Sequence, residues 1–370
     1  MNHVIIEKEK LEHNIHLIKE KAASVKHPPK IIAVIKGNAY GMDAILLAKK
    51  LSDNNINFFA VSETCEAKKL RDNNFNNPIL LLKSTCIEQE INEIIDLNLI
   101  ATVGSIEAIQ KLNERAKEKG KNISAHLKID TGFSRFGFII DDECIQKLKS
   151  ALSIASNIKI EGAYSHFAES YSNSRKQTEK QFSIFMKNVS MLRENGIDTG
   201  MLHICNSSAF FKYSYMYLDA VRIGSAFTGR LQIKEPTGLK KVGYLETEVC
   251  EIKEIMKGSK IGYSGTCTLK RDSKVAILGV GYETGAGVTG MKDAVRFVDK
   301  MRTLKSALKN FMKDRRMFVN INGKSYPLLG RIGMKNMVID VTDGEVKVGD
   351  RVEVPARLIF VNPNIERQER

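Results

Sequence analysis

Long apolar runs are missing from this chain of 370 residues, and so are the features of a secretion signal. No segment approaches the roughly 20 consecutive apolar residues that a membrane-spanning helix requires. The first residues, Met1–Glu7, lack the basic flank, apolar stretch and small-residue cleavage site of a signal peptide. We therefore expect a cytoplasmic protein with no membrane partner.

Paired cysteines are also missing, although the chain contains six cysteines. None belongs to a CxxC pair or lies near a cluster of histidines, which argues against both a zinc site and a disulfide framework. We expect no metal, and reduced, mostly buried thiols at Cys65, Cys86, Cys144, Cys205, Cys250 and Cys267.

Positive charge is abundant, with a net charge of +14 and a pI near 9.3. Such a charge attracts polyanions in general. The lysines and arginines are spread along the whole chain at helix-like spacing, and no basic motif interleaved with aromatic residues stands out. This distribution favours solvated helix faces over a nucleic-acid surface, so we expect no nucleic-acid partner.

The N-terminal part of the sequence alternates short apolar, β-branched runs with helix-like segments. Asp43–Leu51, Glu63–Leu70 and Ile106–Leu112 have apolar residues three or four apart, as amphipathic crossover helices do. Eight such repeats predict an α/β fold with a (β/α)8 TIM-type barrel over residues 1–235. The predicted strands are Ile31–Ile35, Phe58–Val61, Ile79–Leu82, Ile100–Val103, His126–Ile129, Ile160–Tyr164, Leu202–Cys205 and Ala220–Ile223.

After about Pro236 the pattern changes to strand-like runs separated by Gly, Asn, Asp and Lys turns, with one clear helix pattern at Met301–Met312. We therefore predict a mainly β C-terminal domain over residues 236–370. Its predicted strands are Glu246–Ile252, Val275–Val280, Met317–Ile321, Met337–Val341 and Arg351–Val354.

Polar residues follow several of the predicted barrel strands, where active sites of such barrels form. Lys36 ends the first strand beside small residues, and a lysine placed there can form an imine with an aldehyde cofactor. Taken alone, such a lysine is far more often an ordinary surface residue. The loops after the seventh and eighth strands contain Asn206, Ser207, Gly224 and Ser225, which suit a phosphate monoester, although Asn-Ser-Ser is also an ordinary helix cap.

Along essentially its full length the chain resembles the alanine racemase family. The matching motifs occur in the family's order across both predicted domains, each of them short and moderately specific. They are AVIKGNAYG at Lys36, LKIDTGFSRFG at Lys128 and Arg135, SHFA at His166, HICNSS at Ser207, VRIG at Arg222, IGYSGT at Tyr263, GVGY at Tyr282 and GRIGM at Met334.

The resemblance implies pyridoxal 5'-phosphate as the cofactor, with Lys36 as its covalent anchor. It implies that Arg222 lies at the pyridine nitrogen and that Arg135 holds the phenolic oxygen. Lys128, which is carbamylated in some family members, would position Arg135. The remaining implied cofactor contacts are Tyr40, Ser207, Gly224 and Ser225 at the phosphate, with Asn206 and His166 in the same site.

Racemisation needs two bases on opposite faces of a planar intermediate. The resemblance implies Lys36 for one face and Tyr263 for the other. A phenol with an ordinary pKa near 10 needs cationic neighbours to act as a base at neutral pH, and the family arrangement offers His166 and Arg222. The tyrosine would come from the second subunit, which implies a homodimer with composite active sites.

A small amino acid is the implied substrate, contacted by Arg135, Tyr282, Met334 and Lys335. The family usually has an acid in place of Lys335 and commonly a tyrosine where Phe360 stands. These differences leave serine or another amino acid open beside alanine. A barrel-type decarboxylase is disfavoured because it would benefit from a carboxylate in place of Arg222. A cofactor carrier without activity would resemble the barrel alone.

Overall fold

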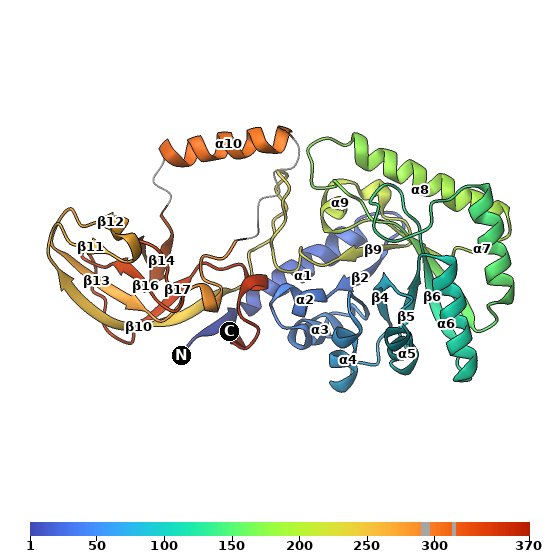
Figure 1. Ribbon diagram of the computed structural model, residues 1–370, viewed down its shortest axis with the longest axis horizontal. Helices are drawn as coiled ribbons and strands as arrows, with labels where there is room; N and C mark the ends of the chain where they lie inside the picture. The colour runs from blue at the N-terminus through green and yellow to red at the C-terminus, as the bar shows by residue number, and fades with distance from the viewer. Residues whose placement is uncertain (290–296, 313–315) are drawn as a thin grey trace. The chain divides into compact units, whose positions relative to one another are not determined.

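The computed structural model describes residues 1–289, 297–312 and 316–370, and the chain forms two compact units (Figure 1). One unit comprises Lys8–Val242, and the other combines Met1–Glu7 with Gly243–Arg370. Each unit has its own sheet, so the predicted combination of a barrel with a mainly β domain is confirmed.

Lys8–Val242 contains a closed barrel of parallel strands in the order β2 to β9, as predicted. Each predicted run overlaps one of these strands, because β-branched and apolar side chains suit strands that are buried on both faces. The strands are β2 (Lys30–Val34), β3 (Phe58–Val61), β4 (Ile79–Ser84), β5 (Ile100–Val103), β6 (Ile123–Lys128), β7 (Ile158–Tyr164), β8 (Met201–His203) and β9 (Ala220–Ile223).

Helices connect these strands and complete the β/α repeats. A core cluster inside the barrel joins Ile32, Ala60, Leu80 and Ala220, each without exposed surface, from four different strands. The helices are α1 (Lys8–Ala23), α2 (Lys36–Tyr40), α3 (Ala44–Asp53), α4 (Thr64–Asp72), α5 (Glu88–Asp96), α6 (Ile106–Glu118), α7 (Asp142–Ile154), α8 (Lys176–Glu194) and α9 (Ser207–Lys212).

The second unit is built on an eight-stranded sheet in the order β13-β16-β15-β14-β17-β10-β1-β18, and a further β10–β13 pairing closes part of it into a ring. All predicted strands of this region are present, and the predicted helix begins earlier, as α10 (Phe297–Met312). The strands are β1 (His3–Ile6), β10 (Tyr244–Ile255), β11 (Lys260–Ile261), β12 (Cys267–Thr268), β13 (Ser273–Leu278), β14 (Phe318–Ile321), β15 (Lys324–Leu329), β16 (Met337–Asp340), β17 (Arg351–Val354) and β18 (Glu366–Glu369).

The division of the chain differs from the predicted domains, 1–235 and 236–370, at both ends of the barrel unit, which runs from Lys8 to Val242. Met1–Glu7 belongs to the C-terminal unit, because β1 pairs antiparallel with β10 and parallel with β18. The barrel closes from β2 to β9, so β1 has no place in the barrel sheet.

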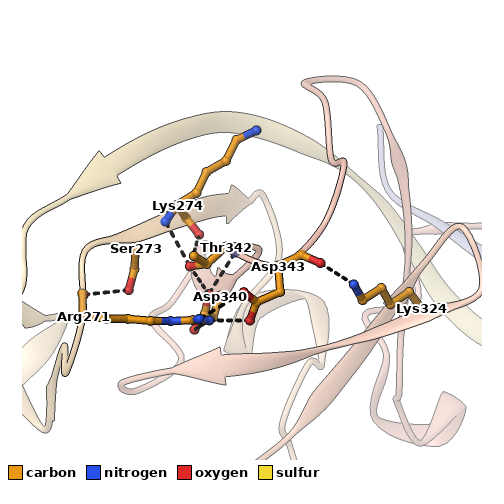
Figure 2. A network of polar contacts seen from close by, with 7 residues as sticks. All are labelled: Arg271, Ser273, Lys274, Lys324, Asp340, Thr342 and Asp343. Carbon is orange, nitrogen blue, oxygen red and sulfur yellow. Dashed lines mark hydrogen bonds and ion pairs between the residues drawn. The ribbon is translucent and has the colours of Figure 1, made fainter.

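A polar network joins the ends of strands in the C-terminal unit (Figure 2). Arg271 donates to both carboxylate oxygens of Asp343, at 3.0 Å for Nη1 to Oδ1, and Lys324 donates to the Asp343 carbonyl. Thr342 Oγ1 donates to Asp340 Oδ1 at 2.6 Å and accepts from the backbone N–H of Lys274 at 3.1 Å. These bonds fix the turn after β16 against β13 and β15.

All six cysteines are free, but the expectation that most are buried is wrong: only Cys205 is buried, while Cys65 and Cys250 are exposed. Within the described part of the chain, no helix is both long and apolar enough to span a bilayer. No group of three or more potential metal ligands occurs among these residues either.

Candidate active site

A cavity of about 460 Å³ opens where the barrel strands end. Its volume lies within the range of small-molecule sites. The sequence analysis named ten residues of the barrel as site residues, and the cavity wall contains all of them: Lys36, Tyr40, Lys128, Arg135, His166, Asn206, Ser207, Arg222, Gly224 and Ser225.

Lys36 begins an unusual turn of chain directly after β2. Gly37, Asn38, Ala39 and Tyr40 all have positive φ, between 50° and 60°, so the segment forms a turn of left-handed helix. This left-handed backbone raises the conformational free energy of every residue that has a Cβ. The Gly37 N–H donates to Glu66 Oε1 at 2.5 Å, and the Asn38 side chain accepts from the Ala44 N–H at 3.0 Å.

The Lys36 amine lies in a cationic, partly desolvated environment. Burial, followed by the positive charge of Arg135, lowers the pKa of Lys36. A lowered pKa increases the uncharged fraction of an amine, and only the uncharged form can attack a carbonyl or accept a proton.

Tyr40, Ser207 and Gly224 form a small polar cradle on another part of the cavity wall. Ser207 Oγ accepts the Gly224 N–H at 3.0 Å, at the start of α9. A Cβ at Gly224 would collide with the Tyr40 hydroxyl, so only glycine permits this close approach. Burial raises the pKa of Tyr40 to about 12, which keeps its hydroxyl protonated as a donor. Hydroxyl donors beside a helix N-terminus suit a phosphate group.

Arg222 is a buried guanidinium held by several acceptors. Its Nη2 donates to the Ser165 carbonyl at 2.6 Å, and its Nη1 donates to His203 Nδ1 at 2.7 Å. Burial lowers the pKa of Arg222 to about 10, so it stays charged at neutral pH. Arg222 Nη2 also lies 3.3 Å from His166 Nδ1.

Two buried histidines extend this contact into the barrel. Because arginine only donates, His203 Nδ1 must accept, and a neutral His203 then carries its proton on Nε2. That nitrogen lies 2.9 Å from His126 Nδ1, which leaves His126 as the acceptor. Burial lowers the pKa of His126 to about 4, and burial together with Arg222 holds the pKa of His203 well below its ordinary value.

His166 is also uncharged, which changes one expectation for this site. Burial, and then the positive charge of Arg222, hold the pKa of His166 well below its ordinary value. The family resemblance implied that both His166 and Arg222 are cations near the second base. In the structure Arg222 retains its charge and His166 does not.

The ring of Tyr164 packs against His203 and two basic residues of the cavity wall. Its ring stacks on His203 with centroids 4.8 Å apart, while Lys128 Nζ lies 4.2 Å and Arg222 Cζ 4.9 Å from its centre. Burial and the nearby positive charges of Arg222 and Arg135 lower the pKa of Lys128 well below its ordinary value. The lowered pKa raises the uncharged fraction of the Lys128 amine, which is the form that carbamylation requires.

Arg135 reaches the cavity from a tight loop after β6. Asp130 Oδ1 accepts three backbone N–H groups, those of Gly132, Phe133 and Ser134, at 2.9 to 3.1 Å. The guanidinium of Arg135 lies over the Phe133 ring at 4.4 Å. The Phe133 ring therefore supports one face of the Arg135 guanidinium.

The other predicted site residues belong to the C-terminal unit and gather there on one surface. Tyr263 is 70% exposed on a turn that begins at Gly262, where φ is 70°. The Tyr282 N–H donates to the Gly333 carbonyl at 3.1 Å. Met334 is exposed, and Lys335 Nζ lies 3.4 Å from Glu283 Oε2. The positive charge of Lys335 is thus balanced locally.

Sequence reasoning missed several residues of this site. Ser62, Glu63 and Lys83 line the cavity at the ends of β3 and β4, and Lys83 Nζ lies 3.3 Å from Glu63 Oε2. His126 and His203 were not given a role. Each is a polar aromatic residue within an otherwise apolar barrel strand, and this pattern could have identified them.

Comparison with known proteins identifies the family. The model of the alanine racemase N-terminal domain matches residues 6–232, and that of the C-terminal domain matches residues 242–359. Alanine racemase 2 of Caldanaerobacter subterraneus subsp. tengcongensis is 31% identical over 93% of this chain and 83% of its own length. The alanine racemase of Methanococcus maripaludis is 32% identical over 91% of this chain and 85% of its own length.

Solved structures agree in fold with both units. An alanine racemase of Clostridium difficile has a TM-score of 0.86 and 25% identity, with 100% of this chain and 95% of that chain covered. The alanine racemase of Bacillus anthracis, solved with bound L-Ala-P, has a TM-score of 0.80, 25% identity and the same coverage. With family models matching both parts of its sequence, this chain belongs to the alanine racemase family.

Proposed function

We propose that this protein is a pyridoxal-phosphate-dependent racemase that interconverts L- and D-alanine, with Lys36 and Tyr263 as its two bases. The observation that carries this proposal is the cavity in which Lys36, Arg135 and Arg222 converge with the Tyr40, Ser207 and Gly224 cradle. Membership of the alanine racemase family supports the assignment of the reaction.

The charges and hydrogen-bonding groups of the cavity residues suit pyridoxal phosphate. Tyr40, Ser207 and Ser225 would hold its phosphate, Arg222 its ring nitrogen and Arg135 its phenolic oxygen, with Lys36 as the covalent anchor. When bound, this cofactor withdraws electrons from the α-carbon of an amino acid and makes its α-hydrogen acidic. Arg222 donates hydrogen bonds and has no proton to release at neutral pH, so it would leave the ring nitrogen unprotonated.

Lys36 would remove or return the α-proton on one face of the substrate. Its lowered pKa raises the uncharged fraction of the amine, and only the uncharged amine can act as a general base. Arg135 would orient the substrate carboxylate, because a guanidinium pairs with a carboxylate through two parallel hydrogen bonds.

Tyr263 would serve the opposite face and come from the second subunit of a homodimer. Its phenol is exposed on the same surface of the C-terminal unit as Tyr282 and Met334, which we assign to substrate contacts. A charged Arg222, and not a charged His166, would stabilise the phenolate.

Alanine is the substrate that we assign to this site. The relatives named above are alanine racemases, and the charge of Lys335 is balanced by Glu283 within the same surface. Serine is the second candidate, because Lys335 replaces the acid that is usual in the family and offers a donor for a polar side chain.

The proposal is tested with the purified, cofactor-loaded protein and a panel of single L-amino acids, each followed by chiral chromatography. We expect alanine to racemise fastest and serine more slowly. Lys335→Asp should leave the preference for alanine in place, since it restores the residue usual in the family. Absence of D-enantiomer from every amino acid of the panel would contradict the proposed activity.

A further inference from the structure

Helix α10 carries large exposed apolar side chains along one of its sides. Phe297, Met301, Leu304 and Leu308 are 76%, 47%, 53% and 59% exposed. These residues, the apolar stripe of α10, follow one another at intervals of four, three and four positions, so they form one continuous line along the helix.

The opposite side of the same helix is polar and less accessible. Asp299, Thr303 and Ser306 are half-buried. The usual arrangement of a surface helix turns the apolar face inward and the polar face outward. Since the apolar stripe of α10 faces outward instead, it is a surface suited to an external partner.

Positive charge flanks the stripe. Lys300 and Lys305 are exposed on its two sides, and Arg302 is exposed further around the helix. Asp299 is half-buried and lies 3.3 Å from Arg302, so the exposed charge beside the stripe is positive. An apolar line bordered by lysine and arginine is typical of helices that lie in the interface of anionic membranes.

We propose that α10 is a peripheral membrane-binding helix, whose apolar stripe enters the headgroup region of an anionic lipid bilayer while Lys300 and Lys305 contact the lipid phosphates. Such binding needs no spanning segment. It requires two weak signals together, apolar burial and electrostatic attraction, and α10 supplies both. The chain's net charge of +14 adds long-range attraction toward the anionic bilayer.

Charge also argues against a second copy of this chain as the occupant. Two α10 helices packed through their stripes would bring Lys300 and Lys305 of one copy close to the same cations of the other, and like charges across such an interface destabilise it. An anionic bilayer neutralises these charges. Its fluid interior also accommodates apolar side chains of different sizes, so no complementary groove is needed.

The test is flotation of the full-length, cofactor-loaded protein with vesicles. One set contains phosphatidylcholine and phosphatidylglycerol in equal parts, and the other contains phosphatidylcholine alone. We expect the protein to float with the anionic vesicles only. Phe297→Ser combined with Leu304→Ser should lower the vesicle-bound fraction at least tenfold, since two large apolar side chains lose their burial.

Two matched controls make the result specific. Ile139→Ser combined with Ile154→Ser removes two exposed apolar side chains of the barrel unit, 75% and 68% exposed, and should leave flotation unchanged. Lys300→Glu with Lys305→Glu should abolish flotation, whereas Lys117→Glu with Lys121→Glu, also at exposed positions, should reduce it only slightly.

Three results would overturn the proposal. The first is no flotation with anionic vesicles. The second is equal loss of flotation in the α10 and barrel variants, which would mean general electrostatic adsorption. The third is a change of oligomeric state, with unchanged flotation, in the variant of Phe297 and Leu304, which would assign the stripe to contacts between copies of the chain.

Discussion

Arg222 owes its position to residues that do not themselves line the cavity. It donates to His203, which in turn donates to His126, and both histidines are neutral. His126 fits beside β7 only because residue 162 is glycine: a Cβ there would lie 2.7 Å from the imidazole Cε1. A residue outside the site thus determines how the guanidinium is held.

Gly162→Ala should displace His126 and disturb Arg222. We expect a loss of stability of about 1–3 kcal/mol from overpacking, measured by urea unfolding, together with a lower kcat for alanine. Adding His126→Ala vacates the space, so the double variant should regain stability relative to Gly162→Ala. Additive losses in the double variant would show that the two residues do not interact.

Acid should destabilise the barrel through its buried histidines. The pKa of His126 is lowered to about 4, and those of His166 and His203 lie well below their ordinary value, chiefly through burial. The unfolded chain binds these protons near pH 6.5 and the folded chain does not. Their contribution to stability is therefore present above about pH 6.5 and is lost as the pH falls toward 4.

The measurement is the urea midpoint at pH 7.5 and pH 5.5, followed by circular dichroism at 222 nm. Each buried histidine contributes a slope of up to roughly 1.4 kcal/mol per pH unit. His126→Gln should reduce the pH dependence, while His27→Gln, at an exposed position, should not. Equal pH dependence in the wild type and His126→Gln would contradict this account.

Single residues could be predicted where a motif gives them a role. Lys36 and Arg135 follow barrel strands and Arg222 lies in the last of them, and topology brings such residues to one end of a barrel. His126 and His203 could not be assigned in this way. Their function depends on hydrogen-bond geometry across strands that are 77 residues apart in the chain, which sequence patterns do not contain.

At the scale of elements, the left-handed turn of α2 determines where Lys36 and Tyr40 lie. Three consecutive non-glycine residues, Asn38, Ala39 and Tyr40, adopt positive φ. Backbone strain of this kind persists where neighbouring contacts hold it, here through Glu66 and the Asn38 side chain.

Gly37→Ala should weaken cofactor binding through the backbone. Gly37 has φ of 60°, and a Cβ added there would meet no atom within 4 Å. Alanine therefore adds conformational strain of about 1 kcal/mol and no collision. We expect a matching loss of stability and a higher Kd for pyridoxal phosphate, measured by equilibrium dialysis.

Gly120→Ala is the matched control for this change. Gly120 has φ of 59°, also with no neighbour within 4 Å, and follows α6 outside the cavity. It should lose similar stability and keep its affinity for the cofactor. An equal change of affinity in both variants would mean that the α2 turn has no specific part in binding.

Most elements could be predicted because their apolar patterns are strong, as in β2 to β9. The missed strands were lost for different reasons. β18, with the sequence Glu-Arg-Gln-Glu, contains no apolar residue and forms only by pairing with β1. β1 is apolar, but its partners lie more than 230 residues away, so its membership of the C-terminal unit is set by tertiary pairing.

At the scale of the whole molecule, the proposal divides catalysis between two copies of the chain. The barrel unit supplies Lys36 and the cofactor cavity, while the C-terminal unit supplies Tyr263. In a homodimer with composite sites, each active site draws Lys36 from one subunit and Tyr263 from the other. Sequence motifs identify both residues, but neither motif contains information about which copy serves which site.

The most direct test is the activity of a heterodimer between Lys36→Ala and Tyr263→Phe subunits, co-expressed with different tags, purified through both and assayed for D-alanine by chiral chromatography. Each homodimer should be nearly inactive, because one base is missing from every site. The heterodimer retains one intact site, so we predict about half of the wild-type activity per dimer. An inactive heterodimer, with both homodimers correctly folded, would contradict the account, because it would place Lys36 and Tyr263 of the same subunit in one site.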